Sequence, residues 1–211
     1  VWQFDHRYGS YGDRGRERGF TSLPPTSAVQ HADPAWLVCP FHWMPRTEVR
    51  PHLGDWTRDW LVGFRDITNA TNERTAILAV LPFAATDFTL RIGLTSATGP
   101  AIACFASGLN SLIIDYIARQ FIGGTHLADY LTKQLPVLPP EAYTAAGLEF
   151  IVPRVEGRTY TAWVIKVFAR AAWRKGVVAV SSDLEGDGLD DRGGGGQHVH
   201  GGGEELDDGG G

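Results

Sequence analysis

Residues 109–140 read LNSLIIDYIARQFIGGTHLADYLTKQLPVLPP, and this stretch decides the expected fold. Two apolar helical segments meet in it at a double glycine. Gly123 and Gly124 stop the first helix, Thr125 can cap the second, and Pro136 forces the second to end. A helix N-terminus without crowding side chains suits a phosphate. The sequence therefore predicts a helix–Gly-Gly–helix corner that is the first place to look for a nucleic-acid contact.

The expected sheet lies before this stretch. Residues 60–67 (WLVGFRDI) and 75–81 (TAILAVL) are short runs rich in apolar and β-branched residues, as is typical of strands, and the polar residues 68–74 join them. The second run is apolar at both alternations, which predicts a position inside the sheet, and Pro82 marks its end. Residues 88–94 predict a third strand.

Helices are expected to follow, together with one more strand. A long helix over residues 100–121 is predicted by apolar residues at three- and four-residue spacing, which would form one buried face: Ile102, Phe105, Leu109, Leu112, Ile113 and Tyr116. Residues 149–153 predict a strand. Residues 159–173 contain a helical stretch with these residues on one side: Trp163, Val167, Phe168 and Ala171. The predicted fold class is α+β, with a small mixed or antiparallel sheet.

Composition divides the chain of 211 residues into three parts. Residues 1–59 are rich in Pro, Gly, Arg and Trp without periodicity, which predicts an irregular arm. Residues 60–180 form the main domain, and residues 181–211 predict a disordered tail of Gly and acidic residues. The net charge is −5, but the tail carries −8, so residues 1–180 carry +3. A mildly basic body permits DNA binding without demanding it.

Cysteine usage and targeting signals favour a cytoplasmic protein. Only Cys39 and Cys104 are present, without metal-type spacing, and no secretion signal or long apolar span occurs. His198 and His200 in the tail are expected to be solvated rather than metal ligands. Because the chain opens with Val1 and reaches its first Met at position 44, we expect a piece of a longer polypeptide.

The polar loop between the first two strands carries side chains that could contact DNA bases. Asn69, Asn72 and Arg74 have paired donors and acceptors that match adenine and guanine edges in the major groove. The alternative is that both Asn side chains close turns, and that Arg74 pairs with a neighbouring carboxylate, Glu73 or Asp66.

Further cations lie close to these elements in the sequence. Arg65 stands within an apolar strand, so its charge needs a carboxylate or a phosphate. Arg119, one turn after Asp115, has an intrahelical partner and can be purely structural. Lys133 and Gln134 follow the glycine corner closely enough to share a ligand with it.

Catalytic patterns are missing from the sequence. There is no nucleotide-binding fingerprint, no clustered Cys/His metal site and no GxSxG turn. Four carboxylates could be imagined as a nuclease metal site, but their spacing fits no recognised arrangement, so surface or turn roles are favoured: Asp55, Asp59, Asp66 and Glu73. We therefore predict no catalytic residue and no metal site.

Several stretches together resemble one protein family. They are residues 4–7 (FDHR), 30–34 (QHADP), 63–68 (GFRDIT), 71–77 (TNERTAI), 115–120 (DYIARQ), 123–127 (GGTHL), 133–140 (KQLPVLPP), 160–163 (YTAW) and 168–170 (FAR). They resemble the C-terminal part of adenine-specific DNA methyltransferases, of the large type found in fused restriction-modification and phage-defence systems. The resemblance covers residues 1–173. Val164 departs from it, because an acidic residue is expected there.

The resemblance implies a division of labour within a longer parent protein. In that family the catalytic domain binds S-adenosylmethionine and carries an Asn-Pro-Pro-aromatic motif, whereas the double prolines here follow Leu23 and Leu138. The resemblance therefore assigns target recognition to this chain, with no cofactor of its own. The implied partners are double-stranded DNA and the catalytic domain of the same polypeptide, and the chain alone would be inactive.

The resemblance also implies roles for the residues singled out above. Asn69, Asn72 and Arg74 become candidates for base contacts. A second set becomes candidates for contacts to phosphate, with Gln134 beside it: Arg65, Gly123, Gly124, Thr125, His126 and Lys133. Two other functions stay open, a protein-interaction module of a restriction or phage-defence complex without DNA contact, and a stand-alone nuclease.

Overall fold

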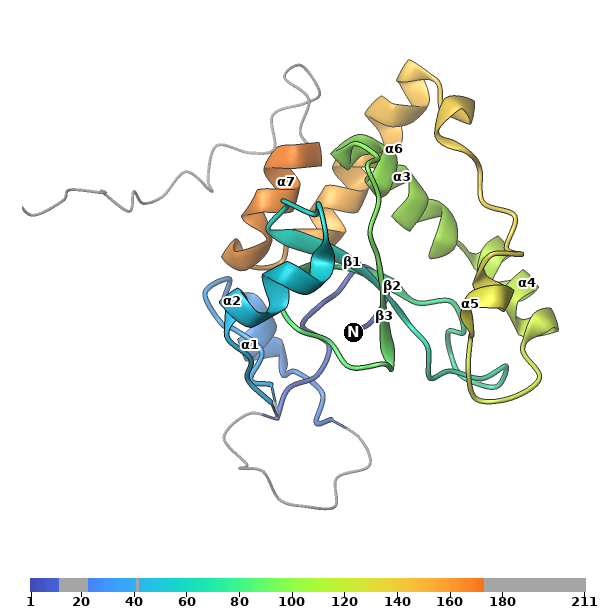
Figure 1. Ribbon diagram of the computed structural model, residues 1–211. Coiled ribbons are helices and arrows are strands. Elements are labelled where there is room, and N and C mark those ends of the chain that lie inside the picture. Colours follow the sequence, from blue (N-terminus) through green and yellow to red (C-terminus); the bar gives the residue numbers. More distant parts are fainter. Residues whose placement is uncertain (12–22, 41, 173–211) are drawn as a thin grey trace, which may run out of the picture. The chain divides into compact units, whose positions relative to one another are not determined.

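Three strands form one antiparallel sheet at the centre of the fold (Figure 1). Their order is β2 (Leu78–Pro82), β1 (Trp60–Arg65), β3 (Leu90–Gly93). The structure is a computed structural model that describes residues 1–11, 23–40 and 42–172. The central strand β1 has a neighbour on each side, and the burial of Trp60, Leu61 and Val62 agrees with the uninterrupted apolar run in the sequence.

Helices make up most of the remaining regular structure, and with the sheet they confirm the predicted α+β class. Within the described residues the α-helices are α1 (Ala28–Ala32), α2 (Arg46–Val49), α3 (Gly99–Leu109), α4 (Leu112–Phe121), α5 (Asp129–Thr132), α6 (Ala145–Thr159) and α7 (Lys166–Ala172). Short 3₁₀ helices are η2 (Arg50–Leu53), η3 (Pro140–Ala142) and η4 (Trp163–Ile165).

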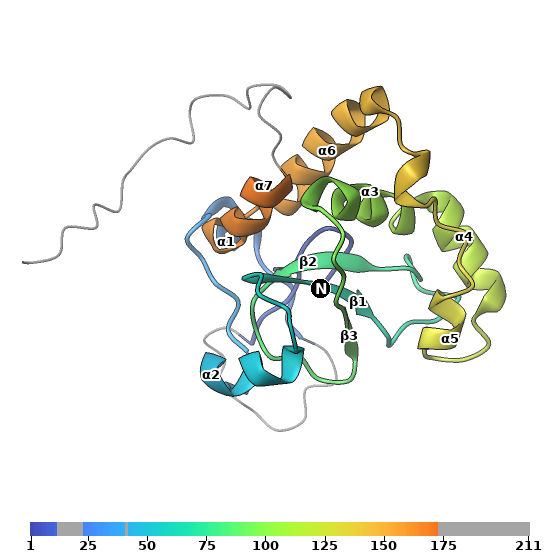
Figure 2. The same cartoon turned by 45° about the horizontal axis from the view of Figure 1, so that its top comes forward.

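The main core lies between the sheet and helices α3, α6 and α7, which gather on one face of it (Figure 2). Trp60 of β1 packs edge-to-face on Phe168 of α7, with 5.0 Å between ring centroids, and on Trp56 at 5.5 Å. Both Trp60 and Phe168 are almost fully buried. Burial of one such side chain contributes about 1.5–3 kcal/mol, so this aromatic cluster fixes the helices on the sheet.

The second strand differs from its prediction in place and in length. It begins at Leu78 rather than at Thr75 and lies at the edge of the sheet, not inside it. Its edge is covered instead of paired with a strand: the Asn110 side chain bonds both the N–H and the carbonyl of Leu78, each at 2.9 Å. Phe4 N–H donates to the same carbonyl. Covering an edge in this way satisfies its backbone groups, which allows an apolar strand to lie there.

The predicted helix over residues 100–121 is in fact two helices, α3 and α4, bent by 61°. Asn110 caps the end of α3 while its side chain binds β2, and Ser111 caps the start of α4 by accepting from Ile114 N–H at 3.2 Å. No single helix of the described residues has the length and apolar character to cross a membrane, although α3 and α4 pass that test when taken together.

The break also overturns the predicted buried face. Ile102 and Leu109 of α3 are buried as predicted, but α4 turns Ile114, Asp115 and Ala118 inward instead. Three predicted core residues of α4 are therefore 66–72% exposed: Leu112, Ile113 and Tyr116.

Residues 149–153, predicted as a strand, lie in the middle of α6. Thr144 caps this helix by accepting from Gly147 N–H at 3.1 Å. Val152, Val155 and Thr159 then recur at helical spacing on its buried side. The local preference of Phe-Ile-Val for a strand is weaker than the packing of this face, much of it against α3.

The helical stretch predicted near the end of the domain is present as η4 and α7. Its buried side is Ile165, Phe168 and Ala172. Trp163, Val167 and Ala171, expected on that side, are exposed. The predictions for residues 181–211, including His198 and His200, lie outside the described residues.

A fully buried arginine organises the N-terminal segments, and we name it with its acceptors the Arg7 cluster. Nη1 of Arg7 donates to Asp33 O at 2.8 Å and to Gln30 O and Trp36 O at 3.4 Å. Nη2 donates to His31 O at 3.0 Å and to Thr161 O. Three of the resemblance stretches, residues 4–7, 30–34 and 160–163, therefore meet at one side chain. In its described residues, 1–11, 23–40 and 42–59, the arm is irregular apart from α1, α2, η2 and an isolated bridge between Gly9 and Pro25. Its first segment packs onto the core through Val1 and Phe4.

Candidate functional site

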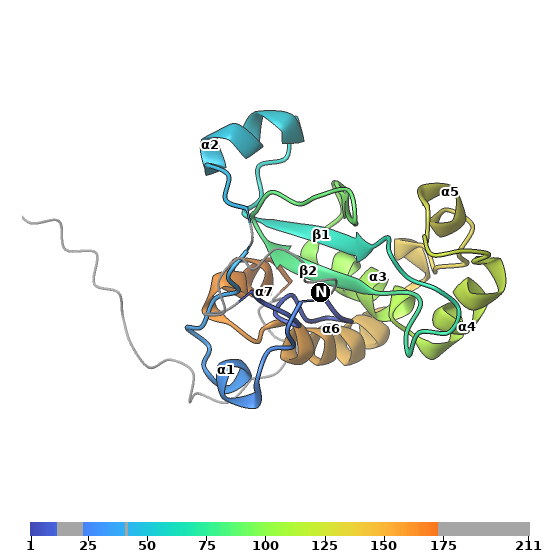
Figure 3. The same ribbon diagram turned by 90° about the horizontal axis from the view of Figure 1, so that it is seen from below.

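The sequence-predicted site residues gather at one end of the sheet. Figure 3 shows α4 and α5 beyond the ends of β1 and β2 where the connecting loop lies, with α1 and α7 near the opposite end. We call residues 65–76 together with residues 123–127 the loop end.

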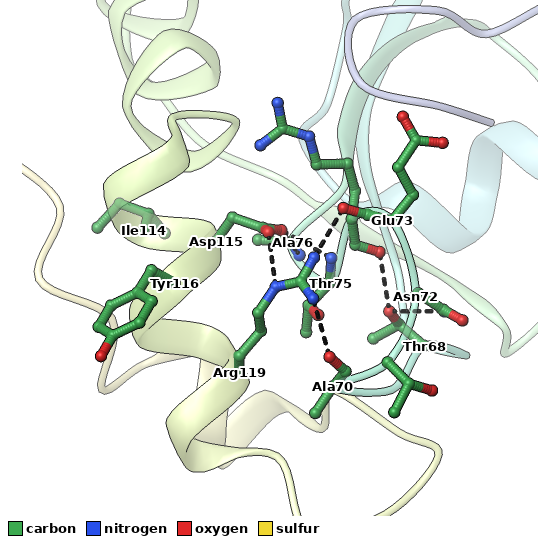
Figure 4. Close-up of polar contacts among 12 residues, drawn as sticks. Thr68, Ala70, Asn72, Glu73, Thr75, Ala76, Ile114, Asp115, Tyr116 and Arg119 are labelled. Carbon is green, nitrogen blue, oxygen red and sulfur yellow. Dashed lines mark hydrogen bonds and ion pairs between the residues drawn. The ribbon is translucent and has the colours of Figure 1, made fainter.

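Asp115 of α4 fixes the base of the loop that joins β1 to β2 (Figure 4). Its buried carboxylate accepts from the backbone N–H groups of Thr75 at 2.7 Å and Ala76 at 2.9 Å, both to Oδ1. Arg119 Nε donates to Oδ2 of the same carboxylate at 3.0 Å. Charge-assisted bonds of this kind are stronger than neutral ones, so the loop is held in one position.

Arg119 reaches from the same helix to the tip of the loop. Its Nη1 donates to Ala70 O at 2.8 Å, and its Nη2 donates to Glu73 O at 2.7 Å (Figure 4). The predicted structural pairing of Arg119 with Asp115 is confirmed. All three guanidinium nitrogens of Arg119 are used internally, so this cation is a support rather than a ligand-binding group.

Asp66 forms a second anchor just after β1. Its buried carboxylate accepts from Arg91 Nε at 3.1 Å and lies 2.6 Å from Nδ1 of His126. Burial acts to raise the pKa of Asp66, but the hydrogen bonds from His126 and Arg91 outweigh it and hold the pKa below its ordinary value. Arg91 also pairs with Asp129 of α5 at 3.2 Å. This network joins β1, β3, α5 and the glycine segment.

The glycine segment pairs with the hairpin loop through its backbone. Thr68 N–H donates to Thr125 O at 3.0 Å, and Leu127 N–H donates to Asp66 O at 2.8 Å. Thr125 does not cap a helix, because the N-cap of α5 is Ala128. The predicted corner is therefore wrong in its second half: α5 begins only at Asp129 and spans one turn.

Gly123 and Gly124 are nevertheless exposed, as the sequence predicts for a site without crowding side chains. A Cβ atom built on either glycine meets no atom of the described structure within 4 Å. The two residues thus offer bare backbone to an approaching molecule.

Arg65 ends β1 without a carboxylate partner in the described part of the chain. Its Nε donates to Ile67 O at 2.8 Å, and its guanidinium lies 5.9 Å from the ring centroid of Trp2. Partial burial lowers the pKa of Arg65 from its ordinary value. The sequence predicts a carboxylate or a phosphate beside this charge. In the described residues its partners are the carbonyl of Ile67 and the aromatic face of Trp2.

The two asparagines of the loop each use one half of the side-chain amide to shape it. Asn69 Oδ1 accepts from the N–H and the hydroxyl of Thr71 at 2.9 and 2.8 Å. Asn72 Nδ2 donates to Thr68 Oγ1 at 3.3 Å. Asn69 Oδ1 and Asn72 Nδ2 therefore shape the loop, as the turn-closing alternative predicts. Asn69 Nδ2 and Asn72 Oδ1 have no partner among the described residues.

Arg74 does not pair with Glu73 or Asp66, so that alternative is wrong. No carboxylate of the described residues lies within ion-pair distance of Arg74, and its Nη1 is buried without a hydrogen-bond partner. Arg74 lines a surface hollow of about 480 Å³ between the loop and α4, with these other lining residues: Glu73, Leu112, Asp115, Tyr116 and Arg119. Sequence analysis missed this hollow, because Leu112 and Tyr116 were assigned to the core.

Lys133 and Gln134 follow α5 and are exposed. Gln134 Nε2 donates to Tyr130 O at 2.9 Å, which leaves its amide oxygen outward. Lys133 makes no ion pair within the described residues.

Two of the four carboxylates considered for a nuclease are engaged in other contacts. Asp59 pairs with Arg46 and Arg50, and Asp66 pairs with Arg91 and His126. Among the described residues, no group of three or more His, Cys, Asp or Glu side chains could hold a metal ion.

Comparison of the chain with protein-family models, with curated proteins and with solved structures finds no match. The family resemblance therefore stands on the quoted stretches, and the geometry of the loop end stands on its own.

Proposed function

We propose that the chain supplies DNA target recognition to a site-specific adenine DNA methyltransferase, and that it contacts double-stranded DNA with the loop end. The observation that carries this proposal is the contrast among the arginines there. Arg91 and Arg119 are neutralised by buried carboxylates, whereas Arg65 and Arg74 have no carboxylate partner in the described chain. Arginines without a carboxylate partner remain available to DNA, Arg65 for a phosphate and Arg74 for a base edge.

The rigid support of the loop agrees with a recognition role. Asp115 and Arg119 together make five hydrogen bonds that fix the loop from both sides, counting the one between them. A reading element held in place beforehand loses little conformational entropy on binding. The free amide halves of Asn69 and Asn72 then present a donor and an acceptor for base edges.

The resemblance assigns the catalytic step to another part of the parent polypeptide, which binds S-adenosylmethionine. In this assignment Asn69, Asn72 and Arg74 contact bases. Phosphate contacts come from a second set, with Gln134 beside it: Arg65, Gly123, Gly124, Thr125, His126 and Lys133. His126 is held through Nδ1 by Asp66, so its exposed Nε2 is the atom that would face a phosphate.

Duplex binding at several salt concentrations tests the proposal. Log affinity should fall linearly with log salt, and Arg65→Ala or Lys133→Ala should each flatten the slope by about 1 for the lost phosphate contact. Lys166→Ala is the matched control, because this exposed cation lies on α7 at the other end of the sheet. Salt-independent binding, or slopes unchanged in both Arg65→Ala and Lys133→Ala, would contradict the proposal.

The exposed apolar side of α4 favours one rival, a protein-interaction module. Leu112, Ile113 and Tyr116 could dock on a partner protein without any DNA contact. The same titration separates the two functions, since only DNA binding releases condensed counterions and loses affinity steeply with salt.

A further inference from the structure

The hollow between the hairpin loop and α4 combines Arg74, already proposed to contact a base, with side chains of α4 that the proposed DNA contacts do not use. Tyr116 is 66% exposed and Leu112 is 69% exposed, so two apolar side chains stand open on the α4 wall. Glu73 and Arg74 form the opposite wall. The volume of about 480 Å³ falls within the roughly 300–1,000 Å³ typical of small-molecule sites.

The walls of the hollow are set before any ligand arrives. Arg119 lies at its base and is bound to Asp115, Ala70 O and Glu73 O, so the backbone that carries Glu73 and Arg74 cannot move independently of α4. Figure 4 shows Tyr116 on the same helix as Asp115 and Arg119, and Glu73 across from them on the loop. The backbone that carries Tyr116 on α4 and the backbone that carries Arg74 on the loop are therefore held at a fixed separation.

The charge of Arg74 indicates what the hollow takes. No described carboxylate balances it within ion-pair distance, and Nη1 of Arg74 is buried without an acceptor. A guanidinium that lines a hollow without a carboxylate partner favours a molecule that brings hydrogen-bond acceptors to it. The exposed Tyr116 ring favours a molecule that is flat and aromatic.

We infer that the hollow is a subsite for a single unstacked nucleobase, and that guanine is the base it fits best. This inference rests on the proposed function and names the ligand of one part of the loop end. Guanine presents the acceptors O6 and N7 to a guanidinium, and its N1–H and N2–H₂ donors suit a carboxylate such as that of Glu73. Tyr116 supplies the stacking face, which by itself accepts any base.

The test compares DNA duplexes that differ in one unpaired position. Four are used with the full chain: a fully paired duplex, and duplexes with an unpaired guanine, an unpaired adenine or an abasic site at the same place. The unpaired guanine should bind about tenfold more tightly than the abasic duplex, with adenine in between because it stacks but lacks the matching edge. The abasic duplex controls for the bend that any unpaired nucleotide introduces.

Variants of the two walls should separate stacking from edge recognition. Tyr116→Ala should remove the advantage of both bases over the abasic site, and Tyr116→Phe should retain it because the ring remains. Arg74→Ala should abolish the preference for guanine over adenine while the stacking advantage persists. Tyr116 is largely exposed, so neither variant at this position threatens folding.

The outcomes distinguish this inference from the proposed function. If all unpaired duplexes, the abasic one included, bind equally while the paired duplex shows a steep salt dependence, the hollow does not bind a base and the DNA-reading function stands. A preference for guanine that survives Tyr116→Ala and Arg74→Ala would also overturn the assignment to this hollow. Absence of any salt-dependent binding would remove both the proposed function and the subsite.

Discussion

The Arg7 cluster and the loop end use the same residue type in opposite ways. Arg7 is completely buried and its two terminal nitrogens donate to five backbone carbonyls, so its guanidinium is inaccessible to another molecule. Beside the loop end, all three guanidinium nitrogens of Arg119 donate to groups of the protein itself. Arg65 and Arg74, in contrast, have no carboxylate partner in the described chain. Residue type therefore does not tell a structural arginine from a ligand-binding one, whereas the partner atoms do.

The stretches that resemble the methyltransferase family fall into the same two regions, the Arg7 cluster and the loop end. Residues 4–7, 30–34 and 160–163 meet at Arg7, and their shared task is to fasten the N-terminal segments to the end of the domain. Residues 63–68 and 123–127 meet at the loop end through backbone pairing. A motif from the first group should matter for folding, and one from the second for binding.

Removal of the Arg7 side chain should have the largest effect on stability. In Arg7→Met the five carbonyls lose their donor inside the fold, and each buried group left unpaired costs about 1–3 kcal/mol before the structure relaxes. We expect a loss of about 3–5 kcal/mol, near the upper end for a point substitution. The urea midpoint followed by Trp fluorescence measures it.

Arg65→Ala is the matched control for that measurement. It removes an arginine of the loop end that makes one hydrogen bond, to Ile67 O, and should shift stability by less than about 1 kcal/mol. Equal losses in the two variants would erase the distinction between the two regions.

Glu156 of α6 allows the contrast between paired and unpaired charges to be tested by pH. Its carboxyl group is buried without a partner that would stabilise the charged form. The carboxyl is 6% exposed, its Oε1 has no partner among the described residues, and burial raises its pKa from 4.5 to about 7. The folded state therefore keeps a proton that the unfolded chain releases. The contribution of Glu156 to the free energy of unfolding should be greatest below pH 4.5, and should fall as the pH rises toward about 7.

Glu156→Gln should remove this pH dependence. Near pH 4.5 the variant and the parent should be equally stable to within about 1 kcal/mol. Near pH 8 the variant should be more stable by about 3 kcal/mol, which is the free energy equivalent of that change in pKa. Unfolding free energies at both pH values measure the difference. A constant offset between the two proteins would show that Glu156 ionises freely in the folded state.

The sequence was sufficient for the parts of the fold that depend on local pattern. The central strand, the third strand and the α+β class follow from short apolar runs and from turn residues. The break between α3 and α4 could not be seen in this way, because Asn110 ends α3 with its side chain bound to β2, far away in the sequence. Once the helix is broken, its apolar period cannot fix which face of α4 turns inward.

For the candidate site, the sequence suggested which residues to consider but not the contacts between them. Local sequence suggested Arg65, the polar loop and the double glycine as one group, and the structure places them at one end of the sheet. Their connection depends on Thr68 N–H donating to Thr125 O and on Asp66 binding Arg91 and His126. Such partners lie tens of residues apart, so spacing alone does not reveal them.

The glycines give the smallest expected effect and the finest distinction between structural and binding roles. A Cβ on Gly99 of α3 would overlap with the backbone of Ala171, whereas a Cβ on Gly123 or Gly124 meets nothing within 4 Å. Gly99→Ala should therefore cost about 1–3 kcal/mol through overpacking. Gly123→Ala and Gly124→Ala should change stability by no more than about 0.5 kcal/mol, as is usual for open surface positions.

The same two loop variants should nevertheless weaken duplex binding if the bare backbone approaches a phosphate. A methyl group there holds the DNA away from the N–H groups, so we expect a loss of about threefold to tenfold in affinity at unchanged stability, equivalent to about 0.7–1.4 kcal/mol. Duplex titrations beside urea unfolding measure both quantities on one sample. Unchanged affinity in both variants would exclude the glycine segment from the DNA contact and leave the loop cations to make it, because no atom of residues 1–11, 23–40 and 42–172 requires glycine at either position.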